Sequence, residues 1–270
     1  MGALGEGAKA ISDVAQVVKD NPHGAKAVDY LAQSAEIVTH TVRNVLLPFA
    51  AINYGVERAK RYFEDKFEND LNERLAEIPP ERIVEPPASI AGPAIQGLAY
   101  SSEEPDLREL YLNLLASSMD ERTRSDAHPA FVDIVRQLSA QDAKLLAALN
   151  EQEAPQFPAL KLKLREEGET SFRPLFGHIL NWPRFGVALT DLQAAAATVE
   201  NWVRLGLFTI SYMEWLTDES AYAFQDEEPL VEIRERFTTE AMSAKYDKGL
   251  LSRTIFGSQF RTAVTRKHAK

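Results

Sequence analysis

The chain has 270 residues, of which 45% are hydrophobic and 26% charged, and its net charge is −10 at pH 7. It contains no cysteine, which excludes disulfides, thiolate metal sites and cysteine nucleophiles. The length favours two domains, and the composition argues against wholesale disorder. Because the first twenty residues lack the basic start and apolar stretch of a secretory signal, we expect a cytoplasmic protein.

Most residues before about 80 are expected to be helical. Residues 1–24 are expected to form an amphipathic segment. From Val28 to Phe63, apolar residues recur in alternating steps of three and four, which is a heptad pattern. Pro48 interrupts this pattern, so we predict two helices, about 25–46 and 49–77. The apolar seam is expected to pack inside its own domain, with homo-oligomerisation through the same seam as the alternative.

The middle of the chain combines a broken stretch with clear helices. Residues 86–102 are uncharged but contain three prolines and two glycines, which predicts a loop with at most one short helix. The acidic turn from Glu103 to Asp106 begins the clearest predicted helix. Another helix is expected to start at Pro129. A domain boundary is expected near residue 138, where Ser139 is suited to cap a further helix.

The following part of the chain has the layout of a winged helix. Residues 189–205 predict a helix, Leu207 to Tyr212 alternate like a strand, and Ala221 to Phe224 are its expected hairpin partner. We therefore predict a mainly α protein, in which an all-helical N-terminal region is followed by a winged-helix-like α+β module. The predicted domains are an N-terminal amphipathic segment (1–24), a helical core (25–137), a winged-helix-like domain (138–250) and a basic tail (251–270).

An ordered series of phrases resembles a known family. The phrases are NVLLPFAAINYGVE, ERLAEIPPERIVEPPASIAGPAIQGLAY, DLRELYLNLLASSMD, AHPAFVDIVRQLSAQDAKLLAAL and NWVRLGLFTI, and they span roughly residues 40–210. Together they resemble the Abi-alpha (abortive infection alpha) family of poorly characterised bacterial proteins. The resemblance implies an intracellular protein of defence against phage, in which an infected cell is stopped or lost before the phage multiplies. It implies no catalytic set.

The resemblance also directs attention to one region of the surface. Seven residues that match recognisable positions of the family form a candidate interaction surface, centred on Asp120 to Phe131. They are Arg108, Tyr111, Asn113, Asp120, His128, Pro129 and Phe131.

No motif of catalysis or cofactor binding is recognisable, so we expect neither an enzyme nor a cofactor. The sequence contains no GxxxxGK[ST], GxGxxG, GxSxG or HExxH. Three carboxylates and an imidazole occur within nine residues, at Asp120, Glu121, Asp126 and His128, but their spacing matches no metal motif. We expect helix caps and solvated charges there rather than a metal site.

We therefore predict an abortive-infection protein that acts by contact with a phage or host protein rather than by catalysis. The first alternative is a nucleic-acid-binding winged helix, which its acidic surface disfavours. In that case phosphate would be held by the C-terminal cations Arg253, Arg261, Arg266, Lys267 and Lys270. The second alternative is a membrane-perturbing effector. Peripheral membrane contact is possible, but the most apolar uncharged run, residues 44–56, is too short to span a bilayer.

Overall fold

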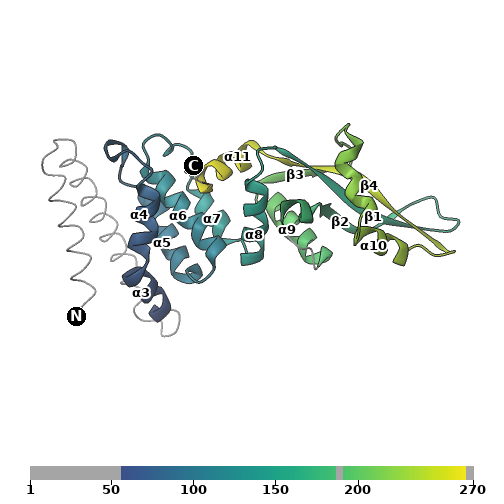
Figure 1. Cartoon of the computed structure of the whole chain (residues 1–270), viewed down its shortest axis with the longest axis horizontal. Helices are drawn as coiled ribbons and strands as arrows, with labels where there is room; N and C mark the ends of the chain where they lie inside the picture. The colour runs from purple at the N-terminus through teal and green to yellow at the C-terminus, as the bar shows by residue number, and fades with distance from the viewer. Residues whose placement is uncertain (1–55, 187–190, 266–270) are drawn as a thin grey trace, which may run out of the picture. The chain divides into compact units, whose positions relative to one another are not determined.

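The computed structural model describes residues 56–186 and 191–265 of the chain (Figure 1). These residues form two compact units, one with residues 56–137 and 263–265, the other with the described part of 138–262. The predicted amphipathic segment 1–24, and the heptad pattern as far as residue 55, lie outside the described residues. The predicted domain bounds stay predictions, because compactness alone does not show which part folds by itself.

Helix α6 is the centre of the first unit. It packs against α4, α5 and α7, and ten of its fifteen residues are buried. A helix that is buried on nearly all sides lies in a core rather than at a surface, which confirms the prediction of a helix after the acidic turn at Glu103. The elements of this unit are α3 (Val56–Asp65), α4 (Phe67–Leu75), η2 (Pro80–Arg82), α5 (Ala88–Ser101), α6 (Pro105–Met119) and α7 (Ala130–Arg136).

Residues 86–102 do not form the predicted loop. Most of them form the 14-residue helix α5, which contains Pro93. Proline removes one backbone hydrogen bond from a helix interior, but α5 buries Ile90, Ala94 and Leu98 almost completely. Burial of several apolar side chains contributes more free energy than one hydrogen bond. The prediction was wrong because local propensity is overridden by packing against α6.

The second unit is built on a four-stranded antiparallel sheet of order β2-β1-β4-β3. Its longest pairing joins β1 to β4 without a register shift, from Gln156 opposite Ser252 to Glu166 opposite Met242. The elements are α8 (Ala140–Asn150), β1 (Gln156–Glu166), β2 (Arg173–Leu180), η3 (Trp182–Phe185), α9 (Leu192–Arg204), β3 (Phe208–Ser211), η4 (Glu219–Asp226), α10 (Leu230–Arg236), β4 (Met242–Arg253) and α11 (Ile255–Val264).

The prediction of a mainly α protein with a winged-helix module was wrong, because the second unit makes this a mixed α and β fold. The predicted helix 189–205 and strand at Leu207 correspond to α9 and β3. However, β3 pairs with β4, and Ala221 to Phe224 belong to the 3-10 helix η4. The wing would need a local hairpin, whereas the strand that pairs with β3 comes about thirty residues after it in the sequence.

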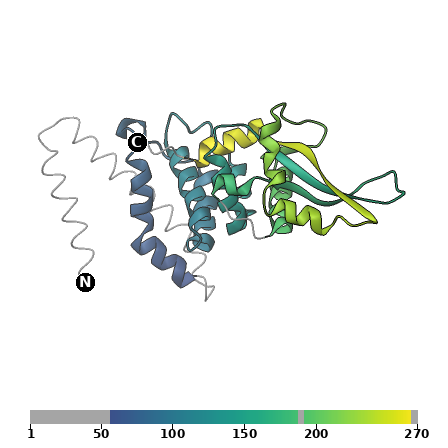
Figure 2. The ribbon, with the colours of Figure 1, turned by 45° about the vertical axis from the view of Figure 1, so that its right-hand side comes forward.

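A hydrophobic cluster covers one face of this sheet. On this face, Leu160, Leu162 and Leu164 of β1 pack together with Tyr222, Phe224 and Leu230 of η4 and α10. Helix α9 packs against β2 and β3. The hairpin between β1 and β2 extends beyond α10 in both views (Figure 1 and Figure 2).

Among the described residues, no helix combines the length and apolar character needed to cross a membrane.

Candidate functional site

The predicted interaction surface lies largely inside the first unit. Tyr111, Asp120 and Phe131 are at most 2% exposed. Arg108 and Asn113 are half-buried, and only His128 and Pro129 are exposed. The interaction surface stays a prediction, but the side chains that a partner would meet there are those of His128 and Pro129.

Two of these residues have evident local roles. The carboxylate of Asp120 accepts hydrogen bonds from the backbone N–H of Arg122 at 3.0 Å and from its guanidinium at 2.7 Å. The latter bond raises the pKa of Arg122. His128 Nδ1 accepts from the backbone N–H of Ala130 at 3.1 Å, at the start of α7. Within the described residues, no group of three His, Asp or Glu side chains is placed to hold a metal ion.

The half-buried polar residues of α6 take part in internal contacts. Asn113 accepts from Arg74 Nε at 3.0 Å and donates to the carbonyl of Val264 at 2.9 Å. Arg108 donates to the carbonyl of Ser102 at 2.7 Å. These bonds tie α6 to its neighbours within the first unit.

The C-terminal cations that were predicted to hold phosphate are not all in a tail. Arg253 is the last residue of β4, and Arg261 lies in α11. Arg253 donates to the carbonyl of Leu149 at 3.0 Å and Arg261 to that of Asn150 at 2.7 Å. These cations thus bind the electronegative end of α8. Burial, together with the neighbouring charge of Arg261, lowers the pKa of Arg253 to about 10.

The other three predicted tail cations, Arg266, Lys267 and Lys270, lie outside the described residues. Two of the five cations therefore have internal carbonyl partners, and the proposal of a phosphate-binding tail would depend on the remaining three.

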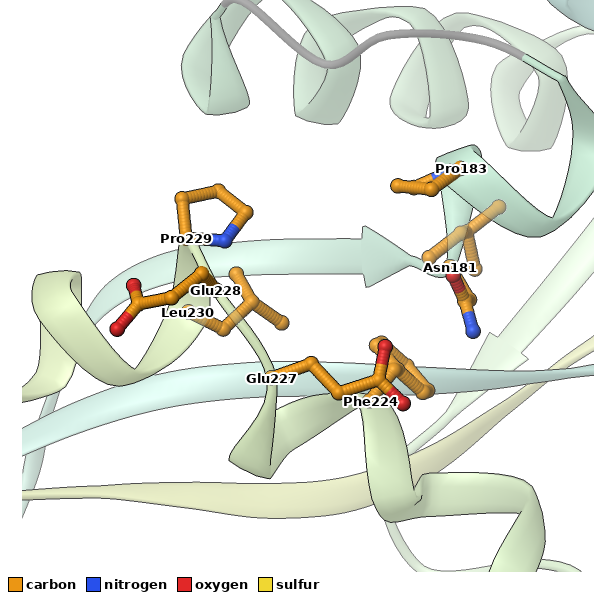
Figure 3. Close-up of a pocket in the computed structure, with 8 residues that line it drawn as sticks. Asn181, Pro183, Phe224, Glu227, Glu228, Pro229 and Leu230 are labelled. Atoms are coloured by element: carbon orange, nitrogen blue, oxygen red, sulfur yellow. The ribbon is translucent and has the colours of Figure 1, made fainter.

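A small hollow lies between the end of β2 and the link from η4 to α10. Figure 3 shows Pro183 and Pro229 on opposite sides of it. Its volume of about 30 Å³ is enough for roughly two water molecules. This volume is smaller than that of the pockets that usually hold metabolites.

Positive charge gathers instead on one face of the sheet. Lys161, Lys163 and Arg165 of β1 alternate with the buried leucines, and side chains alternate across a strand, so these cations lie on the face away from that cluster. The register places Lys245 of β4 opposite Lys163. We call Lys161, Lys163, Arg165 and Lys245 the basic face.

The charges of the basic face are only partly neutralised. Lys163 Nζ lies 2.6 Å from the carboxylate of Asp247. Across the part of the chain that the structure describes, Lys161, Arg165 and Lys245 have no ion pair with a carboxylate. Glu166 and Glu167 follow at the hairpin tip, so the basic face ends there. In a chain whose net charge is −10, this is a local excess of positive charge.

An aromatic ring lies among three of these cations. Nζ of Lys163 and of Lys245 lie 4.4 and 4.7 Å from the ring centre of Phe172, and the guanidinium carbon of Arg165 lies 5.1 Å from it. Each cation is attracted to the ring by about 0.5–1 kcal/mol at an exposed site. The three like charges repel one another. A bound anion would offset this repulsion, so the arrangement favours anionic ligands.

Tyr212 holds the other end of the basic face in place. Gly249 of β4 leaves room for the tyrosine ring, because a side chain there would overlap it. Lys161 Nζ lies 4.2 Å from the ring centre. The hydroxyl of Tyr212 accepts from the backbone N–H of His178 at 2.8 Å. The loop after β3, to which Tyr212 belongs, also carries Met213 and Trp215, which are 87% and 55% exposed.

His178 lies beside this contact in an unusual conformation. Its φ of 57° is in the left-handed region, next to the register irregularity between β1 and β2. Its Nε2 is 3.5 Å from a carboxylate oxygen of Glu200. Burial nevertheless lowers the pKa of His178, with the charge of Glu200 acting in the opposite direction. The environment of the imidazole therefore favours its neutral form.

We expect an NMR titration of His178 to give a midpoint below the ordinary value of about 6.5. As the pH falls below that value, the unfolded chain takes up the proton first, so this residue lowers stability on acidification. The variant His178→Gln identifies the resonance and should lose this part of the pH dependence. A midpoint above 6.5 would mean that the charge of Glu200 outweighs burial.

The basic face was missed in the sequence, although a signal for it exists. The run LKLKLR, residues 160–165, alternates leucine with cations over six residues. Such a period of two predicts a strand with one buried and one charged face. The contributions of Lys245 and Phe172 could not be found in this way, because they depend on strand pairing.

Comparison with known proteins gives one match. The family model described as abortive infection alpha matches residues 59–264. A search of curated proteins and a search of solved structures each gave no match.

Proposed function

Because this chain belongs to the abortive infection alpha family, we propose that it acts in abortive infection by binding an anionic macromolecule through the basic face, rather than by catalysis. The observation that carries the proposal is the cluster of Lys163, Arg165 and Lys245 around Phe172. Several cations held close together on a sheet attract a partner that carries several negative charges.

A partner that is recognised by charge differs from the phage or host protein predicted from the sequence, unless that protein is acidic. A protein partner at His128 and Pro129 stays a prediction, as do the membrane-perturbing alternative and the prediction that the chain is not an enzyme. The basic face supports an anionic partner, because its charges have few partners among the described residues.

The test is a phage challenge of bacteria that express the full chain, at low and at high ratio of phage to cells. Plaque number, host survival and membrane potential are followed together. With the unaltered chain, we expect cultures to survive the low ratio and collapse at the high one. The double variant Lys161→Glu/Lys245→Glu should allow phage growth at both ratios.

The matched control is Lys144→Glu/Arg184→Glu, which makes the same change in net charge at two exposed positions outside the basic face. It should protect like the unaltered chain. Equal loss of protection in both double variants would show an effect of net charge and reject a role for the basic face. Full protection by the Lys161/Lys245 variant would reject it too. A loss of membrane potential in cells that express the unaltered chain would favour the membrane-perturbing alternative.

A further inference from the structure

The cations of the basic face form a row rather than a point. Lys161, Lys163 and Arg165 are two residues apart along β1, so their Cα atoms follow at steps of about 6.8 Å. A row of charges suits an extended polyanion with regularly repeated charges better than a small anion. Nucleic acids and acidic polypeptides both meet this requirement.

The ring of Phe172 favours a nucleic acid over an acidic polypeptide as the ligand. It is half-buried, and three cations lie over it. Lysine side chains are flexible, so a lysine can leave the ring for a phosphate while a base stacks in its place. Stacking on aromatic rings together with phosphate contacts to cations is how single strands are bound. An acidic polypeptide has no regular series of planar rings, and a duplex keeps its base faces inside the stack.

We propose that the basic face binds single-stranded nucleic acid, with phosphates on Lys161, Arg165 and Lys245 and one base on Phe172. This inference rests on the proposed function, since it names the anionic macromolecule. Binding of this kind does not depend on base sequence, because every base has a face that can stack.

The binding test uses the full chain and a fluorescein-labelled oligo(dT) strand of about 20 nucleotides, longer than a typical single-strand site, followed by fluorescence anisotropy. Three phosphate contacts predict a slope of about −2.1 for the logarithm of affinity against the logarithm of salt concentration. Affinity should therefore fall about 20-fold between 50 and 200 mM salt.

Three variants separate the charge from the ring. Lys161→Gln/Lys245→Gln removes two of the three contacts, so its slope should be about −0.7. Phe172→Leu keeps an apolar side chain but removes the ring, so affinity should fall about tenfold with an unchanged slope. The control Lys144→Gln/Arg184→Gln should bind like the unaltered chain.

Three results would overturn the inference. If a duplex of the same length binds as tightly as the single strand, the ring has no role. If poly-glutamate binds, and its binding requires Lys161 and Lys245 while oligo(dT) does not bind, the ligand is an acidic polypeptide and the proposed function survives. If the folded chain binds no oligo(dT) at 50 mM salt, the nucleic-acid assignment is wrong, and the phage challenge with the Lys161/Lys245 variant still decides the proposed function.

Discussion

Replacing Asp142 with alanine is expected to lower the free energy of unfolding by about 3 kcal/mol. Asp142 is 9% exposed and joins helix α8 to α9. Its carboxylate accepts from the backbone N–H of Ser139 at 3.0 Å, from the hydroxyl of Thr198 at 2.6 Å and from the amide of Asn201 at 3.2 Å. Alanine leaves the buried hydroxyl of Thr198 without this acceptor, which is costlier than the loss of an exposed hydrogen bond.

The matched control is Asp191→Ala. Asp191 is also an aspartate at the start of a helix, and it accepts from the backbone N–H groups of Gln193 and Ala194 at 2.9 and 3.0 Å. It is exposed, so its removal should cost only the roughly 1 kcal/mol of a helix cap. Urea denaturation of the three proteins measures both differences. If Asp142→Ala costs no more than Asp191→Ala, the bonds from α9 do not stabilise the unit.

Replacing Gly97 with alanine is expected to lower the free energy of unfolding by about 2 kcal/mol. A Cβ atom at Gly97 would overlap the ring of Tyr111, and that ring is only 2% exposed. Because the ring is buried, a methyl group at this position requires a shift of the ring within the core or a separation of α5 from α6. Glycine at this position is therefore required by the close approach of the two helices.

The control for this variant lies in the same helix. A Cβ atom at Gly92 would meet nothing within 4 Å, so Gly92→Ala should raise stability by about 0.5–1 kcal/mol through its higher helix propensity. The opposite signs of two identical substitutions, measured by thermal and urea denaturation, test the packing of α5 on α6. Equal effects of the two substitutions would mean that Tyr111 does not hold this position.

The candidate interaction surface shows why recognisable positions do not identify a site. The resemblance points to Tyr111 and Phe131, which are buried in the core of the first unit. It also points to Asp120, whose side chain holds Arg122 in the loop after α6. A position can be recognisable because the core requires it, and the residue type alone does not separate that reason from recognition of a partner.

Local sequence determined helices α6, α8 and α9 but not α5, which was predicted to be a loop. Apolar spacing was sufficient for α6 and α9, because a helix forms contacts between residues three and four apart. The capping pair of Ser139 with α8 confirms the expected start of that helix, and β3 lies where its alternation predicts a strand. The family was also recognisable from ordered phrases, four of which fall within the residues 59–264 that the family model matches.

Only the tertiary structure decided the sheet and the basic face. Gln156 pairs with Ser252, although the two residues are far apart in the sequence. No local sequence pattern predicts with which distant strand a residue will pair. The basic face needs that pairing, since Lys245 comes from β4, Phe172 from the turn before β2 and Lys163 from β1. Charges that are far apart in the sequence, in an acidic chain, become one positive surface because backbone hydrogen bonds between strands set their register.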